Sequence, residues 1–236
     1  MITINSYSLQ PYTAGNTPAQ NLGTEWLREA VNKLMRDKRE IESQGADTSL
    51  FFNHNTKTGK NRQGYPLVIY HYINGLFYIT GINEGALAIE KLAAQYQSPF
   101  AVGETVFKNF RSEKDGGEFN PGIVSQQRNY KLIEWRPIHH QQRNAFNQMG
   151  LVAKAAELNT RLEKHLTNEL GKYLNISFEG LKLEITDIDR VYEPVLYKNR
   201  HLYPAFDIRF KANIALPPMI TLGNHQALGY GRVEPV

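Results

Sequence analysis

Among the seven histidines of this chain, His54 has the neighbours best suited to phosphate chemistry. It follows the apolar segment LFFN and begins the loop HNTKTGKNRQG, which also carries Lys57, Lys60 and Arg62. An imidazole can exchange a proton near neutral pH, and a cation can stabilise negative charge developing on a phosphate. The spacing therefore predicts a general base at His54 and a charge stabiliser at Lys60. Lys57 would serve equally well by sequence, and a loop histidine bonded to the backbone is the structural alternative.

The sequence around the other histidines gives less indication of a catalytic role. His139 and His140 are adjacent, and adjacent side chains diverge on a helix or a strand, so the pair does not predict a metal site. We expect both at the start of a helix, with His140 as the alternative base. His165 lies within a helical pattern and is expected to be structural, and His225 is expected to bind rather than to catalyse.

A glycine-rich stretch, TLGNHQALGYGRV, lies near the C-terminus and ends on Arg232-Val233. Its three glycines allow two explanations. They could form a plain turn into a last strand, or they could let successive backbone N–H groups approach an anion closely. The sequence contains no P-loop, G-x-S-x-G or H-E-x-x-H motif that would indicate another chemistry.

The composition sets limits on the class of protein. The chain has 236 residues, 41% of them hydrophobic, which suits one large domain or two small ones. It has no cysteine, so disulfides and thiolate zinc sites are excluded, and its net charge of +4 is compatible with a polyanionic partner. No apolar run is long enough to cross a bilayer, and MITINSYSLQ does not resemble a signal peptide. We therefore expect a cytoplasmic protein without a membrane partner.

The first half alternates strand and helix patterns in the order β-α-β-β-α-β, which is the ferredoxin-like unit. Thr24 and Asn83 are expected to cap its two helices, and Asn74-Gly75 predicts a hairpin turn. The expected strands are 2–9, 49–53, 65–73, 76–81 and 100–110, and the expected helices are 24–42 and 84–96.

Glycine, proline and charged residues at 111–122 predict a domain boundary, after which a similar cycle begins. The expected elements are strands at 130–138, 176–192 and 202–216, a long helix at 140–173, a loop at 221–232 and a short last strand. The sequence therefore predicts an α+β fold of tandem ferredoxin-like (RRM-like) halves, the second with a shortened or missing second helix. The predicted domains are 1–112 and 123–236, the second containing the glycine-rich loop.

The stretch ANIALPPMITLGNHQALGYGRV resembles the C-terminal signature of the CRISPR-associated endoribonuclease family called Cas six. Leu216-Pro217 matches the Leu-Pro segment that precedes the glycine-rich loop of the family. The three glycines match the loop itself, and Tyr230 matches the aromatic position between its last two glycines. Thr221 and Asn224 depart from the pattern, where a glycine and often a lysine are usual. The stretch SLFFNHNTKTGKNRQGYPLVIY is similar to a motif in the N-terminal half of the family, and there His54 matches its histidine.

The resemblance implies a metal-independent endoribonuclease, without a cofactor, that cuts precursor CRISPR RNA within repeats. The RNA 2′-hydroxyl would attack the adjacent phosphorus and leave a 2′,3′-cyclic phosphate. The implied partners are CRISPR repeat RNA and other CRISPR-associated proteins. The residues expected to bind RNA are Lys57, Arg62, Gly223, Asn224, His225, Gln226, Gly229, Gly231 and Arg232, with Tyr65, Tyr70 and Tyr72 as candidates for base stacking.

Two other functions remain open from the sequence. One is a non-catalytic RNA-binding subunit with the same fold, which the departures at Thr221 and Asn224 allow. The other is a ferredoxin-like protein unrelated to RNA, because that fold hosts many functions.

Overall fold

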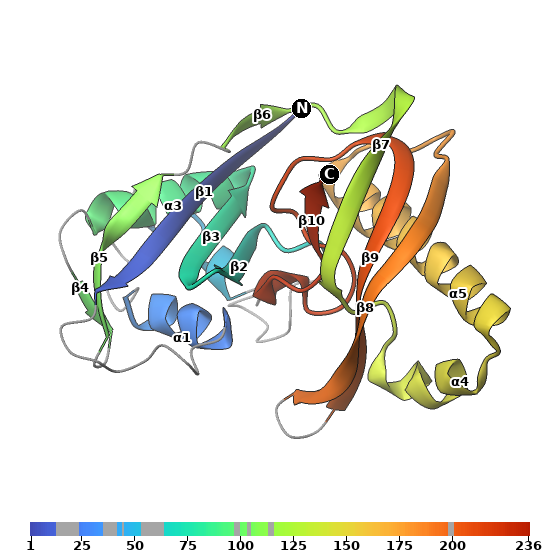
Figure 1. The fold of residues 1–236 in the computed structure, drawn as a ribbon. Coiled ribbons are helices and arrows are strands. Elements are labelled where there is room, and N and C mark those ends of the chain that lie inside the picture. Colours follow the sequence, from blue (N-terminus) through green and yellow to red (C-terminus); the bar gives the residue numbers. More distant parts are fainter. Residues whose placement is uncertain are drawn as a thin grey trace. The chain divides into compact units, whose positions relative to one another are not determined.

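The chain divides into two compact units, which Figure 1 shows as ribbons of the computed structural model. Unit 1 comprises Met1–Phe119 with Ala227–Gly229, and unit 2 comprises Asn120–Gln226 with Tyr230–Val236. The structure describes residues 1–12, 24–34, 42–43, 45–52, 64–96, 100–102, 105–112, 116–197 and 201–236. No helix in those ranges is long and apolar enough to span a membrane.

Unit 1 is an antiparallel sheet in the order β2-β3-β1-β5-β4, with β6 also paired to β1. This is the strand order of a ferredoxin-like unit, as the sequence predicted. The elements are β1 (Ile2–Tyr12), α1 (Thr24–Leu34), the 3-10 helix η2 (Thr48–Phe51), β2 (Val68–Ile73), β3 (Leu76–Ile82), α3 (Glu84–Gln95), β4 (Phe100–Val102), β5 (Thr105–Ser112) and β6 (Gly117–Phe119).

The hairpin between β2 and β3 confirms the predicted Asn-Gly turn. Ile73 pairs with Leu76, and the two turn residues, Asn74 and Gly75, have φ values of 50° and 83°. Both values are positive, as a two-residue turn that matches the twist of its strands requires.

Three local expectations for unit 1 are wrong. Residues 48–51 form a buried 3-10 helix rather than a strand, because the Asp47 side chain accepts a hydrogen bond from Ser49 N at 2.9 Å. The Asn83 side chain does not cap α3; its Oδ1 accepts instead from Thr3 N at 3.1 Å. The single strand expected at 100–110 is two strands, β4 and β5.

Unit 2 is a four-stranded antiparallel sheet in the order β10-β7-β9-β8, which is again the ferredoxin-like order. Between β9 and β10 the chain forms the glycine-rich loop with one short 3-10 helix, so the prediction of a shortened or missing second helix is confirmed. The elements are β7 (Gly122–Trp135), η3 (His140–Gln142), α4 (Arg143–Gln148), α5 (Leu151–Lys164), the π-helix η4 (His165–Gly171), α6 (Lys172–Leu174), β8 (Leu183–Tyr197), β9 (His201–Ala215), η5 (Gln226–Leu228) and β10 (Arg232–Pro235).

The long helix predicted at 140–173 is interrupted. Met149 and Gly150 have extended backbones, so α4 ends before α5 begins. Leu158, Leu162 and the leucines that follow in η4 are buried and form an apolar face, whereas Tyr173 is 45% exposed. The helix therefore packs one face on the sheet over only part of its predicted length.

The burial of this stripe predicts how α5 responds to truncation. Leu162→Ala should lower the free energy of unfolding by about 2–5 kcal/mol, because Leu162 is fully buried and its loss leaves a cavity. Leu151→Ala is the matched control, since Leu151 lies on the same helix and is 86% exposed. Urea unfolding of both variants checks this, and equal destabilisation would contradict the packing.

Candidate functional site

The residues that the sequence placed first lie outside the described part of the chain. His54, Lys57, Lys60 and Arg62 all fall within 53–63. Their assigned roles therefore stay predictions. The described candidates are the residues of the glycine-rich loop and Arg232.

The loop is fastened to the end of β7 by its backbone. Gly223 forms a parallel bridge with Arg136, and Asn224 donates twice to the Arg136 carbonyl oxygen, from N at 2.9 Å and from Nδ2 at 2.8 Å. Further along, Gly231 N donates to Ile133 O at 2.9 Å. Asn224, which was expected to bind RNA, thus uses its backbone and side-chain amides to hold the loop.

Close packing against the chain itself accounts for the loop glycines. A Cβ at Gly223, where φ is 96°, would lie 2.9 Å from Arg136 O and 3.0 Å from the Trp135 ring. At Gly231 it would collide with the Leu222 carbonyl. Gly229 is grouped with unit 1, and there a Cβ would collide with a β2 carbonyl. These contacts favour the structural explanation of the glycines, and RNA contact at the same positions stays a prediction.

His225, which follows Asn224 in the loop, lies against the side chain of Arg136. His225 Nδ1 lies 3.3 Å from Arg136 Nη1, and the guanidinium carbon lies 3.4 Å from the centroid of the Tyr230 ring. His225 is half-buried and has a φ of 64°, which is unusual for a residue other than glycine. The loop therefore brings one predicted binding residue against a buried cation.

A second contact joins this group to the histidine pair. His140 Nδ1 lies 3.0 Å from the Tyr203 hydroxyl, and the Tyr203 ring lies 4.4 Å from the ring of His225. The rings of His139 and His140 are only 4.1 Å apart, although adjacent side chains were expected to diverge. The expectation fails because His139 has an extended backbone and His140 begins η3. Among the described residues, no three His, Asp or Glu side chains are grouped as metal ligands.

Glu169 holds the loop from the π-helix η4. Gln226 Nε2 donates to Glu169 Oε2 at 2.6 Å, and the Gly223 backbone also donates to this carboxylate. Desolvation raises the pKa of Glu169 to about 7, and the two hydrogen bonds offset that rise only in part. Gln226, also expected to bind RNA, therefore fixes the loop to the helix.

His165 lies one turn before Glu169, with its Nε2 3.7 Å from Glu169 Oε1. Trp135 Nε1 donates to His165 Nδ1 at 3.2 Å, so this ring carries its proton on Nε2. Burial lowers the pKa of His165 to about 4, and the positive charge of Arg161 acts in the same direction. These contacts agree with the structural role expected for His165.

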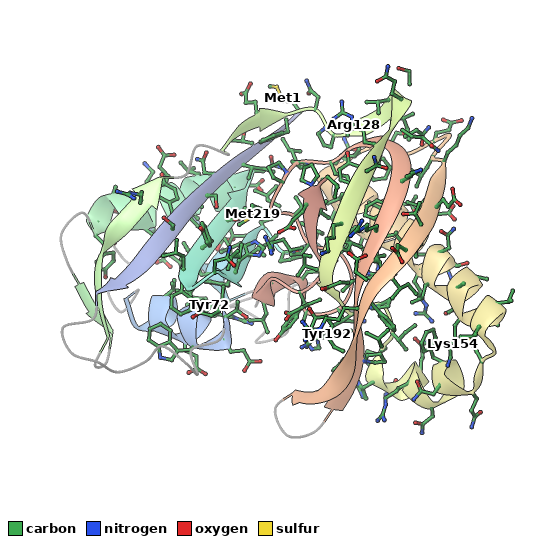
Figure 2. All side chains as sticks on the ribbon, viewed as in Figure 1. Met1, Tyr72, Arg128, Lys154, Tyr192 and Met219 are labelled. Atoms are coloured by element: carbon green, nitrogen blue, oxygen red, sulfur yellow. The ribbon has the colours of Figure 1, made fainter. Side chains whose placement is uncertain are left out.

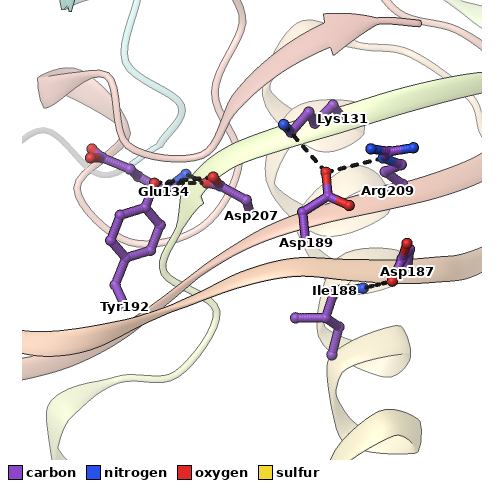
Figure 3. Close-up of polar contacts among 8 residues, drawn as sticks. All are labelled: Lys131, Glu134, Asp187, Ile188, Asp189, Tyr192, Asp207 and Arg209. Carbon is purple, nitrogen blue, oxygen red and sulfur yellow. Dashed lines mark hydrogen bonds and ion pairs between the residues drawn. The ribbon is translucent and has the colours of Figure 1, made fainter.

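Several cations of unit 2 have carboxylate partners. Arg232, expected to contact RNA, pairs with Glu234 at 2.5 Å. On the sheet, Asp189 lies between Lys131 at 3.3 Å and Arg209 at 3.0 Å (Figure 3). Arg136 differs from them, because it takes part in none of the ion pairs among the described residues.

The tyrosines considered for base stacking divide by burial. Tyr65 and Tyr70 are buried, and the Tyr70 hydroxyl donates to Phe51 O at 3.0 Å, so both belong to the core of unit 1. Tyr72 on β2 is 39% exposed (Figure 2). Of these three, Tyr72 alone keeps a surface on which a base could stack.

Sequence reasoning missed Arg136, Tyr203 and Glu169. Each follows or lies within an ordinary strand or helix pattern, and no motif marks it. Their grouping depends on where the loop is anchored, and the sequence around the glycines does not specify that anchor. Only the aromatic position at Tyr230 carried a signal, through its match to the loop signature.

Residues 25–114 match the Cas6b N-terminal domain family. The whole chain also matches solved structures over their full length: a crystal structure of Cas6b at 17% identity and TM-score 0.74, and one of the CRISPR RNA processing endoribonuclease Cas6b at 18% and 0.64. A third, Csf5, a type IV Cas6 crRNA endonuclease, matches at 13% identity and TM-score 0.64, with both chains fully covered. No curated protein sequence matches the chain. The family domain and the shared fold confirm the resemblance to the Cas six family.

The contacts of Glu169 predict a pH effect on stability. Its folded pKa, about 7, lies above the ordinary value of 4.5, so the folded state binds its proton more tightly. This contribution to stability is complete below pH 4.5 and is lost as the pH rises toward 7. His165 acts oppositely: its folded pKa of about 4 lies below 6.5, so its contribution is complete above pH 6.5 and is lost as the pH falls toward 4.

Glu169→Gln should therefore remove the loss between pH 4.5 and 7 and leave stability rising with pH up to about 6.5. The change should be modest, because 39% of the Glu169 side chain is exposed and solvent screens it. Thermal unfolding across pH 4–8 measures it, with Glu163→Gln on the exposed side of α5 as the control. An unchanged pH profile in Glu169→Gln would show that the pKa of the Glu169 carboxyl is not raised in the folded protein.

Proposed function

We propose that this chain, which carries a Cas6b N-terminal domain and has the Cas6b fold, is an endoribonuclease that cuts precursor CRISPR RNA within repeats. The observation that carries the proposal is the agreement of two different comparisons. The family domain covers 25–114, and the shared fold extends over the whole chain. The Cas6b and Csf5 structures bear names that describe CRISPR RNA processing.

The reaction uses a nucleophile that RNA itself contains. The 2′-oxygen attacks the adjacent phosphorus, forming a new P–O bond while the bond from phosphorus to the 5′-oxygen breaks. The 2′-hydroxyl proton passes to a base, and the leaving oxygen takes up a proton to become a 5′-hydroxyl. The upstream product ends in a 2′,3′-cyclic phosphate. No metal takes part, and DNA is not a substrate because it lacks the 2′-hydroxyl.

The roles of the residues follow from this chemistry. His54 is the general base, and Lys60 stabilises the charge that develops on the phosphate. Lys57, Arg62 and the glycine-rich loop bind the RNA backbone. Other CRISPR-associated proteins are further partners in this proposal.

His140 is the alternative base, and its contact with Tyr203 gives that alternative a structural reason. The hydroxyl at 3.0 Å from Nδ1 holds the imidazole in one orientation, as a positioned base requires. A non-catalytic RNA-binding subunit is the alternative function. Asn224 supports it, since this residue replaces a usual lysine and is engaged in holding the loop.

The proposal predicts the behaviour of His54→Ala. In excess EDTA, wild-type protein should cleave its repeat RNA, and His54→Ala should cleave it about 10²–10⁴-fold more slowly. Repeat binding should stay nearly unchanged, because a base acts on a proton that moves only in the transition state. Single-turnover cleavage and filter binding with end-labelled RNA measure the two quantities.

His140→Ala is the comparison variant. If it abolishes cleavage while His54→Ala cleaves at the wild-type rate, the base lies in unit 2. If wild-type protein binds the repeat and never cuts it, the non-catalytic function is correct. Activity that EDTA abolishes and a divalent metal restores would overturn the mechanism.

A further inference from the structure

Glu169 is a half-buried carboxyl group that the glycine-rich loop contacts through uncharged donors. Gln226 Nε2 donates to its Oε2 at 2.6 Å, and the Gly223 backbone N–H donates to the same carboxylate. Among the ion pairs of the described residues, Glu169 takes part in one, with His165 Nε2 at 3.7 Å from Oε1. A carboxylate withdrawn from water is costly to ionise unless a positive charge accompanies it.

His165 supplies little positive charge to Glu169. Trp135 Nε1 donates to its Nδ1 at 3.2 Å, and burial lowers the pKa of His165 to about 4. Arg161 on α5 lowers that pKa further by its own charge and is itself paired with Glu157 at 2.7 Å. Above the pKa of His165, Glu169 therefore faces a neutral imidazole and two neutral N–H donors.

Two further titratable or charged groups lie on the elements that contact the π-helix η4. His225 precedes Gln226 in the loop, and Arg136 at the end of β7 lies against His225. The causes of the pKa shift in Glu169 include neither of them. Desolvation raises this pKa to about 7, and the hydrogen bonds from Gln226 and Gly223 lower it only in part. The carboxyl therefore keeps its proton more tightly here than it would in water.

The loop has a second anchor that does not involve Glu169. Asn224 donates to the Arg136 carbonyl oxygen from its N at 2.9 Å and from its Nδ2 at 2.8 Å. Loss of the bonds to Glu169 therefore frees Gly223 and Gln226 without detaching the loop from β7. One permanent anchor and one ionisable anchor together allow a local opening of the loop in a protein that stays folded.

We propose that Glu169 is a positioning residue that holds the glycine-rich loop while its carboxyl is protonated and releases the loop when the carboxyl ionises. A group that binds its proton more tightly in one state favours that state at low pH. Ionisation in the held state leaves a half-buried charge without a cation, and this charge gains hydration when Gly223 and Gln226 move away. The proposal assumes neither RNA binding nor cleavage.

Hydrogen exchange at the Gly223 amide tests the release directly, because this N–H donates to Glu169. The rates are measured by NMR on the wild-type protein and corrected for the intrinsic pH dependence of amide exchange. Protection should fall by about tenfold or more between about pH 5 and pH 8, because each unit of difference in pKa between the held and released states is worth a factor of ten. Constant protection would overturn the proposal.

The Ile208 amide separates local release from global unfolding. Ile208 is fully buried in β9, so its amide exchanges when the whole unit unfolds, and low concentrations of urea should accelerate it. The Gly223 amide should exchange much faster than that of Ile208 and should respond little to urea, because a local opening exposes little surface. Equal rates and equal urea dependence at the two amides would overturn the proposal.

Glu169→Gln identifies the group that titrates. Glutamine keeps an acceptor oxygen and cannot ionise, so the fall in Gly223 protection with pH should disappear in this variant. Glu163→Gln, on the exposed side of α5, is the matched control and should keep the wild-type pH dependence. A fall that persists in Glu169→Gln would overturn the proposal and assign the release to another group, such as His225.

These measurements separate the inference from the proposed function, because no RNA is present in them. Release of the loop with rising pH in a protein that never cuts repeat RNA supports the role of Glu169 and overturns the endoribonuclease. Cleavage by a protein whose Gly223 protection is constant with pH does the reverse.

Discussion

Pairing between the C-terminal loop and the Arg136 backbone is the contact on which the organisation of unit 2 depends. The sheet order β10-β7-β9-β8 requires the chain to pass from β9 to the far side of β7, a path that a helix covers in an ordinary ferredoxin-like unit. In this protein the glycine-rich loop makes that connection. The backbone bridge between Gly223 and Arg136 turns the loop toward β10. Ile220 and Leu222 are buried along the way, so the loop also supplies apolar surface in place of the second helix.

The same contact arranges the side chains that could act on RNA. With the loop fixed at Arg136, His225 lies against the guanidinium and Gln226 reaches Glu169 on the π-helix. π-Helical turns are uncommon and are often found at functional sites, and this one contains both His165 and Glu169, of which Glu169 contacts the loop. Asn224 and Gln226 therefore use their side-chain amides to hold the loop.

The sequence predicted the fold because that prediction depends on local patterns. Strand alternation, the Asn74-Gly75 turn and the leucine stripe at Leu158 and Leu162 reappear as strands, hairpin and packed helix. It failed where a side chain makes a specific non-local or capping bond. Asp47 binds the backbone of the next turn and so produces a 3-10 helix, and Asn83 bonds to β1 instead of capping α3.

The site was harder to predict for the same reason. The glycine-rich stretch was recognised, but the sequence does not show that Arg136 would lie beneath it, since nearly ninety residues separate Arg136 from His225. The most direct test of the account is the chemistry of the cut ends, read by mass spectrometry after wild-type protein has processed repeat RNA in EDTA. The account predicts a 2′,3′-cyclic phosphate on the upstream fragment and a 5′-hydroxyl on the downstream one. A 3′-hydroxyl with a 5′-phosphate would contradict it, because attack by the 2′-hydroxyl cannot produce those ends.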